Sequence, residues 1–396
     1  MTSSSTPQTG GMTRGAVLLF AIAGGAAVGN LYWAQPLLGT IADAFDIPTS
    51  SAGLVVTVTQ IGYALGVFFL VPLGDVVNRK RVIPILMVLA AVFLTATGLA
   101  PTFSLLLAAL ALLGVTTVAG QFLTPLAGDL ASDDQRGRVL GTVASGLILG
   151  LLISRTVSGI VSDLLGWRAI FFFAAGLMVA LAIVMARFLP PLEPRARVPY
   201  GTLLGSVLRT AGTNARVRTT MLIGATMMCV FTLFWTGLTF LLSDAPYSYS
   251  VTQIGAVSLV GIAGAVAAMR VGRLFDRGLS LPAIGAGLLL TLAALVISGI
   301  GTTSIIAVLV SVALFSVGLQ SVQVLVQTRM LSIDPAARSR LNTVFIVGNF
   351  IGGAIGSTLA GVFWEVGGWP VLMFAAATVV GVALTIWATQ RTRTLA

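Results

Sequence analysis

The residue best suited to chemistry is an arginine within an apolar stretch. Arg155 lies in the run 139–162, which carries no other charged residue. An arginine at the centre of a membrane helix costs about 2.5–3.5 kcal/mol, so it persists where it gains a partner or a water-filled cavity. Its planar guanidinium suits a carboxylate, a phosphate or paired acceptor oxygens on a ligand. We therefore predict that Arg155 faces a central cavity and binds substrate there.

Snorkelling is the structural alternative for Arg155. The residue lies seven positions before the end of its uncharged run, which corresponds to roughly 10 Å of helix. At this depth the long side chain can reach partway toward the outer headgroups while its stem stays in lipid. The sequence alone leaves this alternative open.

Amide, phenol and indole side chains at similar depth form a second candidate set. Such groups hydrogen-bond hydroxylated or heteroaromatic solutes, but each alone also serves as interhelical glue, worth about 0.6 kcal/mol on average. Tyr32 and Trp33 fit an aromatic belt at the outer interface instead. The predicted substrate-binding residues besides Arg155 are Asn30, Gln60, Tyr63, Gln320, Gln323, Asn349 and Trp235.

Missing residue types exclude several classes of function. The sequence has no histidine, which removes imidazole proton relays, common metal sites and serine–histidine catalysis. Lys80 is the only lysine, so the phosphate loop G-x-x-x-x-G-K-[ST] is absent. The single cysteine, Cys229, lies in an apolar segment and is predicted to be an inert packing thiol. We expect no catalytic residue, no metal and no cofactor, and a gradient as the energy source.

Apolar helices must position these residues. The 396 residues are 57% hydrophobic and 9% charged, and uncharged runs such as 82–128 are too long for a soluble core element. Because lipid forbids unsatisfied backbone groups, each span is predicted to be helical. Charges, prolines and glycine turns predict an all-α integral membrane protein whose twelve spans lie near 15–38, 51–74, 82–100, 103–127, 139–162, 168–189, 217–242, 252–271, 279–299, 303–328, 341–364 and 369–389.

The basic residues predict the orientation of these spans. If both termini are cytoplasmic, 20 of the 22 basic residues fall in termini and inside loops, as the positive-inside rule requires. This distribution accounts for the net charge of +10 without nucleic acid, and we expect a multi-pass protein of a bacterial inner membrane. The predicted divisions are a disordered cytoplasmic N-terminus (1–14), a six-helix bundle (15–189), a cytoplasmic connector (190–216), a second six-helix bundle (217–389) and a cytoplasmic tail (390–396).

An internal repeat relates the two bundles. At an offset of 202 residues the first half aligns with the second through arginines, glycines, a threonine and a tryptophan. Two parallel six-helix repeats around a midplane cavity are the geometry of alternating-access transporters. The twin of Arg155 is Ser357, so the fold itself does not require a cation at this position.

The loop after the second span carries a recognisable pattern. Its sequence VPLGDVVNRKR (71–81) resembles the motif G-x-L-x-D-R-x-G-R-R of the major facilitator superfamily, and GRLFDRG (272–278) is its twin. The resemblance implies that the aspartate caps a helix across the interface of the halves, where a carboxylate gains about 0.3–1 kcal/mol. A solvated loop that only follows the charge rule is the alternative for the basic residues. The residues assigned to this conformational latch are Asp75, Arg79, Lys80, Asp276 and Arg277.

Small residues repeat in the fifth and eleventh spans. The fifth span resembles the antiporter motif G-x-x-x-G-P-x-x-G-G of the same superfamily, with a leucine where the proline belongs. Small residues at a spacing of four let helix backbones approach closely. The polar pair expected in the fourth span of drug/proton antiporters is replaced by leucines. The residues predicted to act in helix packing are Gly146, Gly150, Gly348 and Gly352.

The resemblance covers nearly the whole chain and implies a secondary transporter. Our leading prediction is proton-coupled efflux of drug-like or sugar-like solutes, although no carboxylate lies at mid-membrane depth to carry the proton. One alternative is an organic-anion exchanger or uptake permease in which Arg155 binds the anion. Another is a non-transporting membrane scaffold or sensor. The expected partners are a small-molecule substrate, the lipid bilayer and protons, and the expected state is a monomer.

Overall fold

The chain folds into helices joined by short turns. The computed structural model describes residues 11–74, 76–190 and 199–395, and within them no strand is present, which confirms the predicted all-α class. The elements in chain order are α1 (Arg14–Gly29), η1 (Gln35–Leu37), α2 (Leu38–Phe45), α3 (Thr49–Leu73), α4 (Arg79–Leu99), α5 (Phe103–Thr116), α6 (Ala119–Leu130), α7 (Arg136–Leu165), α8 (Ala169–Phe188), α9 (Tyr200–Thr213), α10 (Ala215–Ser243), α11 (Val251–Val257), η2 (Ser258–Gly261), α12 (Ile262–Asp276), α13 (Ser280–Ile300), α14 (Ile305–Ser332), η3 (Pro335–Ala337) and α15 (Arg338–Gln390).

These helices account for twelve membrane crossings. Among the described residues ten helices are long and apolar enough to span a bilayer, with α5–α6 and α11–α12 each counted as one. Helix α1 is apolar but shorter. Helix α15 divides at Gly367 and Gly368, and Gly368 has a φ of 62°, a conformation that glycine adopts without steric cost. Together, α1 and the division of α15 bring the ten spans to the predicted twelve.

Side-chain caps mark where several spans begin. The Asn78 side chain accepts a hydrogen bond from the N–H of Lys80 at 2.9 Å, which starts α4. Ser250 and Gln253 form a capping box at the start of α11. Such caps satisfy backbone donors that the first helical turn leaves free. Further capping side chains belong to Thr13, Thr102, Asn214 and Ser304.

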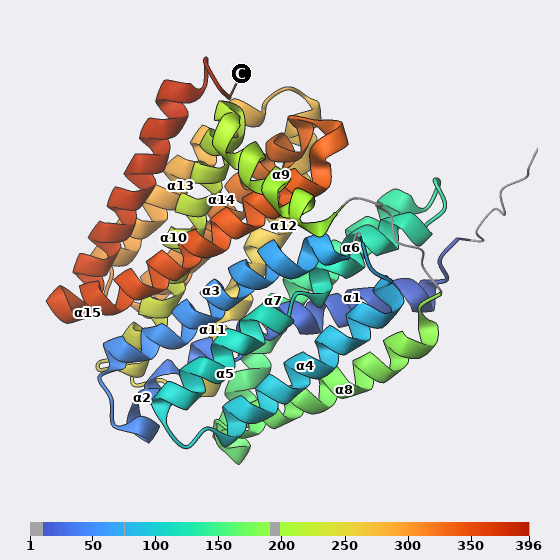
Figure 1. The fold of residues 1–396 in the computed structure, drawn as a ribbon. Helices are drawn as coiled ribbons and strands as arrows, with labels where there is room; N and C mark the ends of the chain where they lie inside the picture. Colours follow the sequence, from blue (N-terminus) through green and yellow to red (C-terminus); the bar gives the residue numbers. More distant parts are fainter. Residues whose placement is uncertain (1–10, 75, 191–198, 396) are drawn as a thin grey trace, which may run out of the picture.

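The spans form two bundles that lie side by side (Figure 1). Helices α1–α8 surround one core of buried apolar side chains and α10–α15 surround another. In the first bundle α1 packs against α7 and α4 against α8, and in the second α10 packs against α15 and α13 against α14. This arrangement confirms the predicted architecture of two six-helix repeats.

The two bundles meet at the end of the molecule opposite the start of α1, which we call the closed end. Here α7 crosses α11, and α3 crosses α15. The Asp163 carboxylate accepts a hydrogen bond from the backbone N–H of Thr252 at 2.9 Å, and the hydroxyl oxygens of Thr57 and Ser357 lie 2.8 Å apart. The Ser50 hydroxyl donates to Glu365. These contacts join the halves at the closed end.

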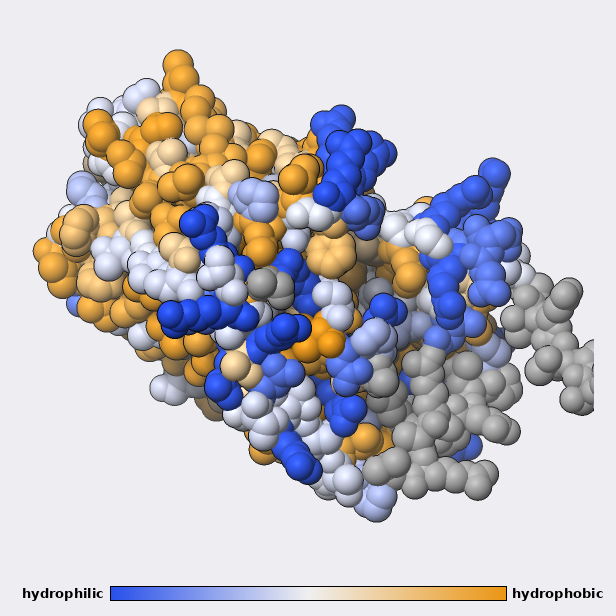
Figure 2. Space-filling view, turned by 90° about the horizontal axis from the view of Figure 1, so that it is seen from above, coloured by the Kyte–Doolittle hydropathy of each residue, from blue (hydrophilic) through white to orange (hydrophobic). Residues whose placement is uncertain are grey.

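The opposite end carries the polar connector. Viewed from the C-terminal side, hydrophilic side chains gather over the middle of this face, while hydrophobic ones cover its flank (Figure 2). Helix α9 lies here, within the predicted connector 190–216, and packs against α3 and α15. Its Tyr200 hydroxyl donates a hydrogen bond to the Phe69 carbonyl, which ties the connector to the first bundle.

The first span differs from its predicted form. Residues 15–38 are predicted as one helix, but α1 ends at Gly29 and the chain turns through 30–34 into η1. Pro36 lies in the first turn of η1, where a helix does not need its missing N–H. Inside one continuous helix 15–38 the same proline would remove a backbone hydrogen bond and clash with the preceding turn, so α1 does not run through it. Residues 1–10 of the predicted N-terminal segment, 191–198 of the connector, residue 396 of the tail, and Asp75 lie outside the described residues.

Candidate substrate cavity

A cavity of about 240 Å³ lies between the two bundles. The first bundle contributes α7 and Tyr32, and the second contributes α10, η2, α14 and α15. Its wall is mainly apolar and aromatic with a few polar side chains, the usual composition of a small-molecule site. The aromatic lining residues are Tyr32, Phe231, Trp235, Phe315 and Phe350, and the polar ones are Arg155, Ser316, Gln320, Gln323 and Asn349.

Among the described residues, Arg155 is the one charged residue that lines this cavity. Its side chain is 2% exposed, and its guanidinium carbon lies 4.1 Å from the ring centre of Trp235, 5.1 Å from that of Tyr32 and 5.5 Å from that of Phe231. We call these three rings the aromatic cage. The arginine therefore points between the halves, and this placement does not correspond to snorkelling toward headgroups.

The guanidinium of Arg155 is left without a hydrogen-bond partner. Its Nε, Nη1 and Nη2 atoms are buried, and within the described part of the chain none of them donates to an acceptor. Cation–π contacts with desolvated rings contribute about 2 kcal/mol, but they do not satisfy N–H groups, and a buried charge without a partner is strongly unfavourable. The arrangement leaves the donors of Arg155 available to an acceptor in the cavity.

Close helix crossings hold α7 in place behind Arg155. A Cβ on Gly150 would lie 2.1 Å from the Gly25 carbonyl oxygen of α1, so only glycine permits this approach. One turn beyond the arginine, the Ser158 hydroxyl donates to the Trp33 carbonyl at 2.6 Å. On the other side of the helix, a Cβ on Gly255 would lie 2.5 Å from the Arg155 carbonyl oxygen. The backbone of residue 155 is thus fixed between α1 and α11.

The remaining glycines predicted to act in packing also lie at close crossings. A Cβ on Gly146 would lie 2.5 Å from the Ala21 carbonyl oxygen, and one on Gly352 would lie 2.1 Å from that of Ala225. At Gly348 the nearest atom is the Met221 Cγ, at 2.5 Å. Because Gly348 faces a flexible side chain and not backbone, a substitution there is easier to accommodate.

Three predicted amides meet on the second half's side of the cavity. Asn349 Nδ2 donates to Gln323 Oε1 at 3.2 Å, and Gln323 Nε2 donates to the Gly224 carbonyl at 3.2 Å. The Oδ1 atom of Asn349 stays buried and unpartnered among the described residues. Gln320 lines the same wall. The structure therefore brings Gln320, Gln323, Asn349, Trp235 and Arg155 together around one space.

The other predicted binding residues do not line this cavity. Asn30 Nδ2 donates to Thr117 Oγ1 at 3.0 Å, and Asn30 Oδ1 accepts from Trp33 Nε1 at 2.9 Å. The Tyr63 hydroxyl accepts from Gln121 Nε2 at 2.9 Å. These contacts link neighbouring spans, the role given above as the alternative for each polar residue alone.

Gln60 is the third predicted residue outside the cavity. It is 1% exposed and lies beside Gly353 of α15, and neither of its amide atoms has a hydrogen-bond partner in the described chain. Its position between α3 and α15 places it in the contact between the halves and away from Arg155.

Comparison with known proteins agrees with this architecture. The family model described as Major Facilitator Superfamily matches residues 18–337. The chain belongs to this superfamily. The "Uncharacterized transporter YgaY" of Escherichia coli O157:H7 is 40% identical over 371 residues, which cover 94% of each chain. A "Probable sugar efflux transporter" of Helicobacter pylori (strain G27) is 22% identical over 316 residues, which cover 78% of each.

Solved structures of the superfamily share the fold at low sequence identity. The human organic anion transporter MFSD10 (TETRAN) superposes with a TM-score of 0.73 at 16% identity, covering 96% of this chain and 100% of the other. A variant of the nucleoside transporter NupG superposes with a TM-score of 0.77 at 15% identity, covering 94% and 99%. The family model and the relative that is 40% identical place the chain among membrane transporters, which are generally not enzymes, so this chain is a multi-pass membrane transporter.

The residues of the superfamily loop motif, assigned above to a conformational latch, differ in the contacts they make. Arg79 donates from Nε to the Gly74 carbonyl at 2.8 Å and pairs with Asp129 at 3.3 Å. Lys80 lies in the first turn of α4, where its backbone N–H donates to the Asn78 side chain at 2.9 Å. Asp276 and Arg277 are exposed at the end of α12, and in the described chain neither side chain has a hydrogen bond or ion pair. In this conformation Asp276 thus makes no latch contact, and the latch role of Asp75 stays a prediction.

Sequence reasoning misses part of the cavity wall. It assigns Tyr32 to an aromatic belt and does not single out Phe231, Phe315 or Phe350. Phe231 lies one helical turn before Trp235, a spacing that places both on one face, and this could have indicated a shared aromatic surface. Gln35, which borders a second cavity beside Arg155, is also missed.

Proposed function

We propose that this superfamily transporter carries a small amphipathic organic anion, with the acid group bound by Arg155 and the apolar part held by the aromatic cage. The observation that carries the proposal is the unpartnered guanidinium. A carboxylate or similar oxyanion supplies the acceptor oxygens and the opposite charge that Arg155 lacks in the described chain. The apolar wall then favours an aromatic or aliphatic acid over a highly hydrated ion.

Transport is proposed to follow alternating access. The contacts at the closed end join the two bundles on one side of the cavity that lies between them. Rocking of one bundle against the other would expose this cavity to each side of the membrane in turn. No acidic residue of the described chain lines the cavity, so a charge change on the protein there does not explain coupling. The charge of the substrate itself is proposed to balance Arg155 during each crossing, which favours exchange of anions.

Purified protein tests binding most directly. We expect phenylacetate to raise the melting temperature of the parent protein and of an Arg138→Gln control, whose arginine is exposed on the same helix. Phenylacetamide, which has the same shape without the charge, is expected to have no comparable effect. Arg155→Gln should fold and lose the response, because ligand stabilisation follows RT ln(1 + [L]/Kd). Equal responses of Arg155→Gln and the parent would refute the proposal.

Proteoliposomes test transport. Vesicles loaded with unlabelled phenylacetate should accumulate the labelled acid by counterflow, without an imposed pH gradient. Accumulation that requires a pH gradient would support proton coupling instead. Arg155→Gln vesicles and protein-free vesicles are the controls for passive entry of the protonated acid.

Proton-coupled efflux of sugar-like solutes is the second candidate. The relatedness to a protein named as a sugar efflux transporter supports this function. So do the three amide side chains that line the cavity, because amides both donate to and accept from hydroxyl groups; these side chains are Gln320, Gln323 and Asn349. Stabilisation by neutral polyols that depends on Asn349 and not on Arg155 would favour this function.

A further inference from the structure

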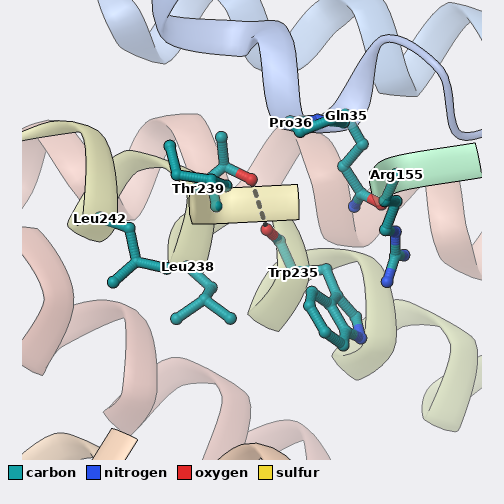
Figure 3. Close-up of a pocket in the computed structure, with 8 residues that line it drawn as sticks. Gln35, Pro36, Arg155, Trp235, Leu238, Thr239 and Leu242 are labelled. Atoms are coloured by element: carbon teal, nitrogen blue, oxygen red, sulfur yellow. Dashed lines mark hydrogen bonds between the residues drawn. The ribbon is translucent and has the colours of Figure 1, made fainter. Parts of the chain in front are cut away.

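A second, much smaller cavity lies on the other side of Arg155. Its volume is about 10 Å³, enough for roughly one water molecule. Gln35 and Pro36 of η1 form one wall, and Trp235 and Thr239 of α10 form another (Figure 3). Ile254 of α11 also borders it. Since η1 belongs to the first half and α10 and α11 to the second, the cavity lies in the seam between the halves.

Gln35 is a polar residue that borders this small cavity together with Arg155 and Thr239. Its side chain extends toward the side chain of Arg155 (Figure 3), and both residues border the same space. It is 3% exposed, and neither Nε2 nor Oε1 has a hydrogen-bond partner in the described chain. A buried amide without partners loses its hydration without compensation. Two buried polar side chains with unused hydrogen-bonding atoms therefore lie next to each other across one small cavity.

We propose that Gln35 is a second recognition residue for the substrate, which binds the acid group together with Arg155 from the side of the closed end. The inference rests on the proposed function. Gln35 Nε2 would donate to a carboxylate oxygen while the guanidinium donates to the other, and Gln35 Oε1 would accept from a hydroxyl or N–H next to the acid group. The cavity holds only about one water in the present conformation, so the two residues share the substrate when the seam opens.

A carboxylate at position 35 tests this geometry without any ligand. Gln35→Glu places an acid group where the substrate's own is proposed to bind, so it should pair with Arg155 and raise the melting temperature. The increase should disappear when Arg155→Gln is added. Gln60→Glu is the matched control, because Gln60 is an equally buried and unpartnered amide of the same half that lies outside both cavities; there the carboxylate should only destabilise. The same change of melting temperature in both Arg155 backgrounds would overturn the proposal.

Ligand binding supplies the second measurement. We expect Gln35→Leu to weaken the binding of mandelate by about 5- to 10-fold. The binding of phenylacetate should weaken by less, because phenylacetate lacks the α-hydroxyl that Gln35 Oε1 is proposed to accept from. Gln60→Leu should leave both affinities within about twofold of the parent. Unchanged affinities in Gln35→Leu would overturn the role of Gln35. If the parent binds neither acid, the proposed function fails, while the coupling of Gln35→Glu to Arg155 still reports whether the two side chains meet.

Discussion

Arg155 in the first half and Ser357 in the second occupy equivalent positions of the repeat, yet their side chains have opposite surroundings. The Arg155 side chain extends into the cavity, whereas the Ser357 hydroxyl is fully buried in the contact between the halves, 2.8 Å from Thr57 Oγ1. The backbones at the two positions are nevertheless used alike. A Cβ on Gly255 would lie 2.5 Å from the Arg155 carbonyl oxygen, and one on Gly53 would lie 3.2 Å from that of Ser357.

The equivalence continues toward the closed end. A Cβ on Gly159 would meet the Val251 carbonyl oxygen at 2.5 Å, and a Cβ on its twin Gly361 would meet that of Ser50 at 2.5 Å. Asp163 and Glu365, again separated by 202 residues, contact the starts of α11 and α3. The duplicated framework thus builds the same crossing twice, and the arginine is an addition that only one crossing carries. This difference separates what the fold requires from what a ligand requires.

The largest effect is expected when an arginine is added to the second crossing. Ser357→Arg would bury a long charged side chain in a packed contact, which we expect to destabilise the closed conformation by on the order of 5 kcal/mol. Thermal unfolding would measure the loss of stability. Labelling of a cysteine at position 258 with a thiol reagent, in a Ser258→Cys, Cys229→Ala background, would measure opening of the closed end, because Ser258 is 1% exposed in the contact between the halves. Ser357→Ala is the control with little change. A Ser357→Arg protein that stays closed and stable would contradict the assigned difference between the crossings.

The reverse exchange should remove binding while stabilising the protein. Arg155→Ser makes the first crossing resemble the second, and loss of a buried charge partner costs about 2–5 kcal/mol of binding, or at least about 30-fold in affinity for an acid. The ligand-free protein should melt at a higher temperature, since an unpartnered buried charge is gone. Isothermal titration and thermal unfolding measure the two effects. A lower melting temperature would mean that Arg155 is a structural residue.

The twelve spans and the two halves could be predicted, because the spans follow from local hydropathy and the halves from a repeat at an offset of 202 residues. Hydropathy and charge act on a segment wherever its neighbours lie. Which face of a span points inward is a different matter. Gln320 and Gln60 are both amides within apolar spans, yet Gln320 lines the cavity and Gln60 lies between α3 and α15. A helix that is apolar on all sides carries no pattern that distinguishes lipid from a neighbouring helix.

The aromatic cage was hidden for a related reason. Phe231 and Tyr32 are ordinary residues in a chain that is 57% hydrophobic, and only tertiary packing brings their ring centres to 5.5 Å and 5.1 Å from the Arg155 guanidinium. Gln35 escapes prediction because 15–38 reads as one continuous helix. The turn before Pro36 directs Gln35 into the seam. The available signal was the proline itself, because the residue before a proline disfavours the α conformation and a helix usually ends there.

An intermediate effect is expected at the two glycines that face the repeated crossing. Gly255→Ala should open the closed end more than Gly53→Ala, because its Cβ would meet a carbonyl oxygen at 2.5 Å and not at 3.2 Å. Overpacking of this kind costs about 1–3 kcal/mol. Labelling of Ser258→Cys compares the two variants, and Gly176→Ala, where a Cβ would meet nothing within 4 Å, is the control. Equal labelling of the two variants would show that the crossings are equally tight.

The smallest effect is expected from the acidic residues at the rim of the same crossings. Asp163 accepts a bond from the backbone N–H of Thr252 at 2.9 Å, near the positive end of α11, where a negative charge contributes about 0.3–1 kcal/mol. In the described chain the Glu365 carboxylate accepts its side-chain hydrogen bond from the Ser50 hydroxyl and none from a backbone N–H, so Asp163→Asn should loosen the closed end more than Glu365→Gln. Both effects should shrink in high salt, because exposed charges are screened. The rate at which Ser258→Cys is labelled reports the free energy of opening for each variant. Since the two contacts lie at separate crossings with no shared partner, the change in this free energy in the double variant should equal the sum of the changes in the single variants. A double variant that labels far more than this sum predicts would mean that the two crossings open as one unit, and that the duplicated framework acts as a single gate.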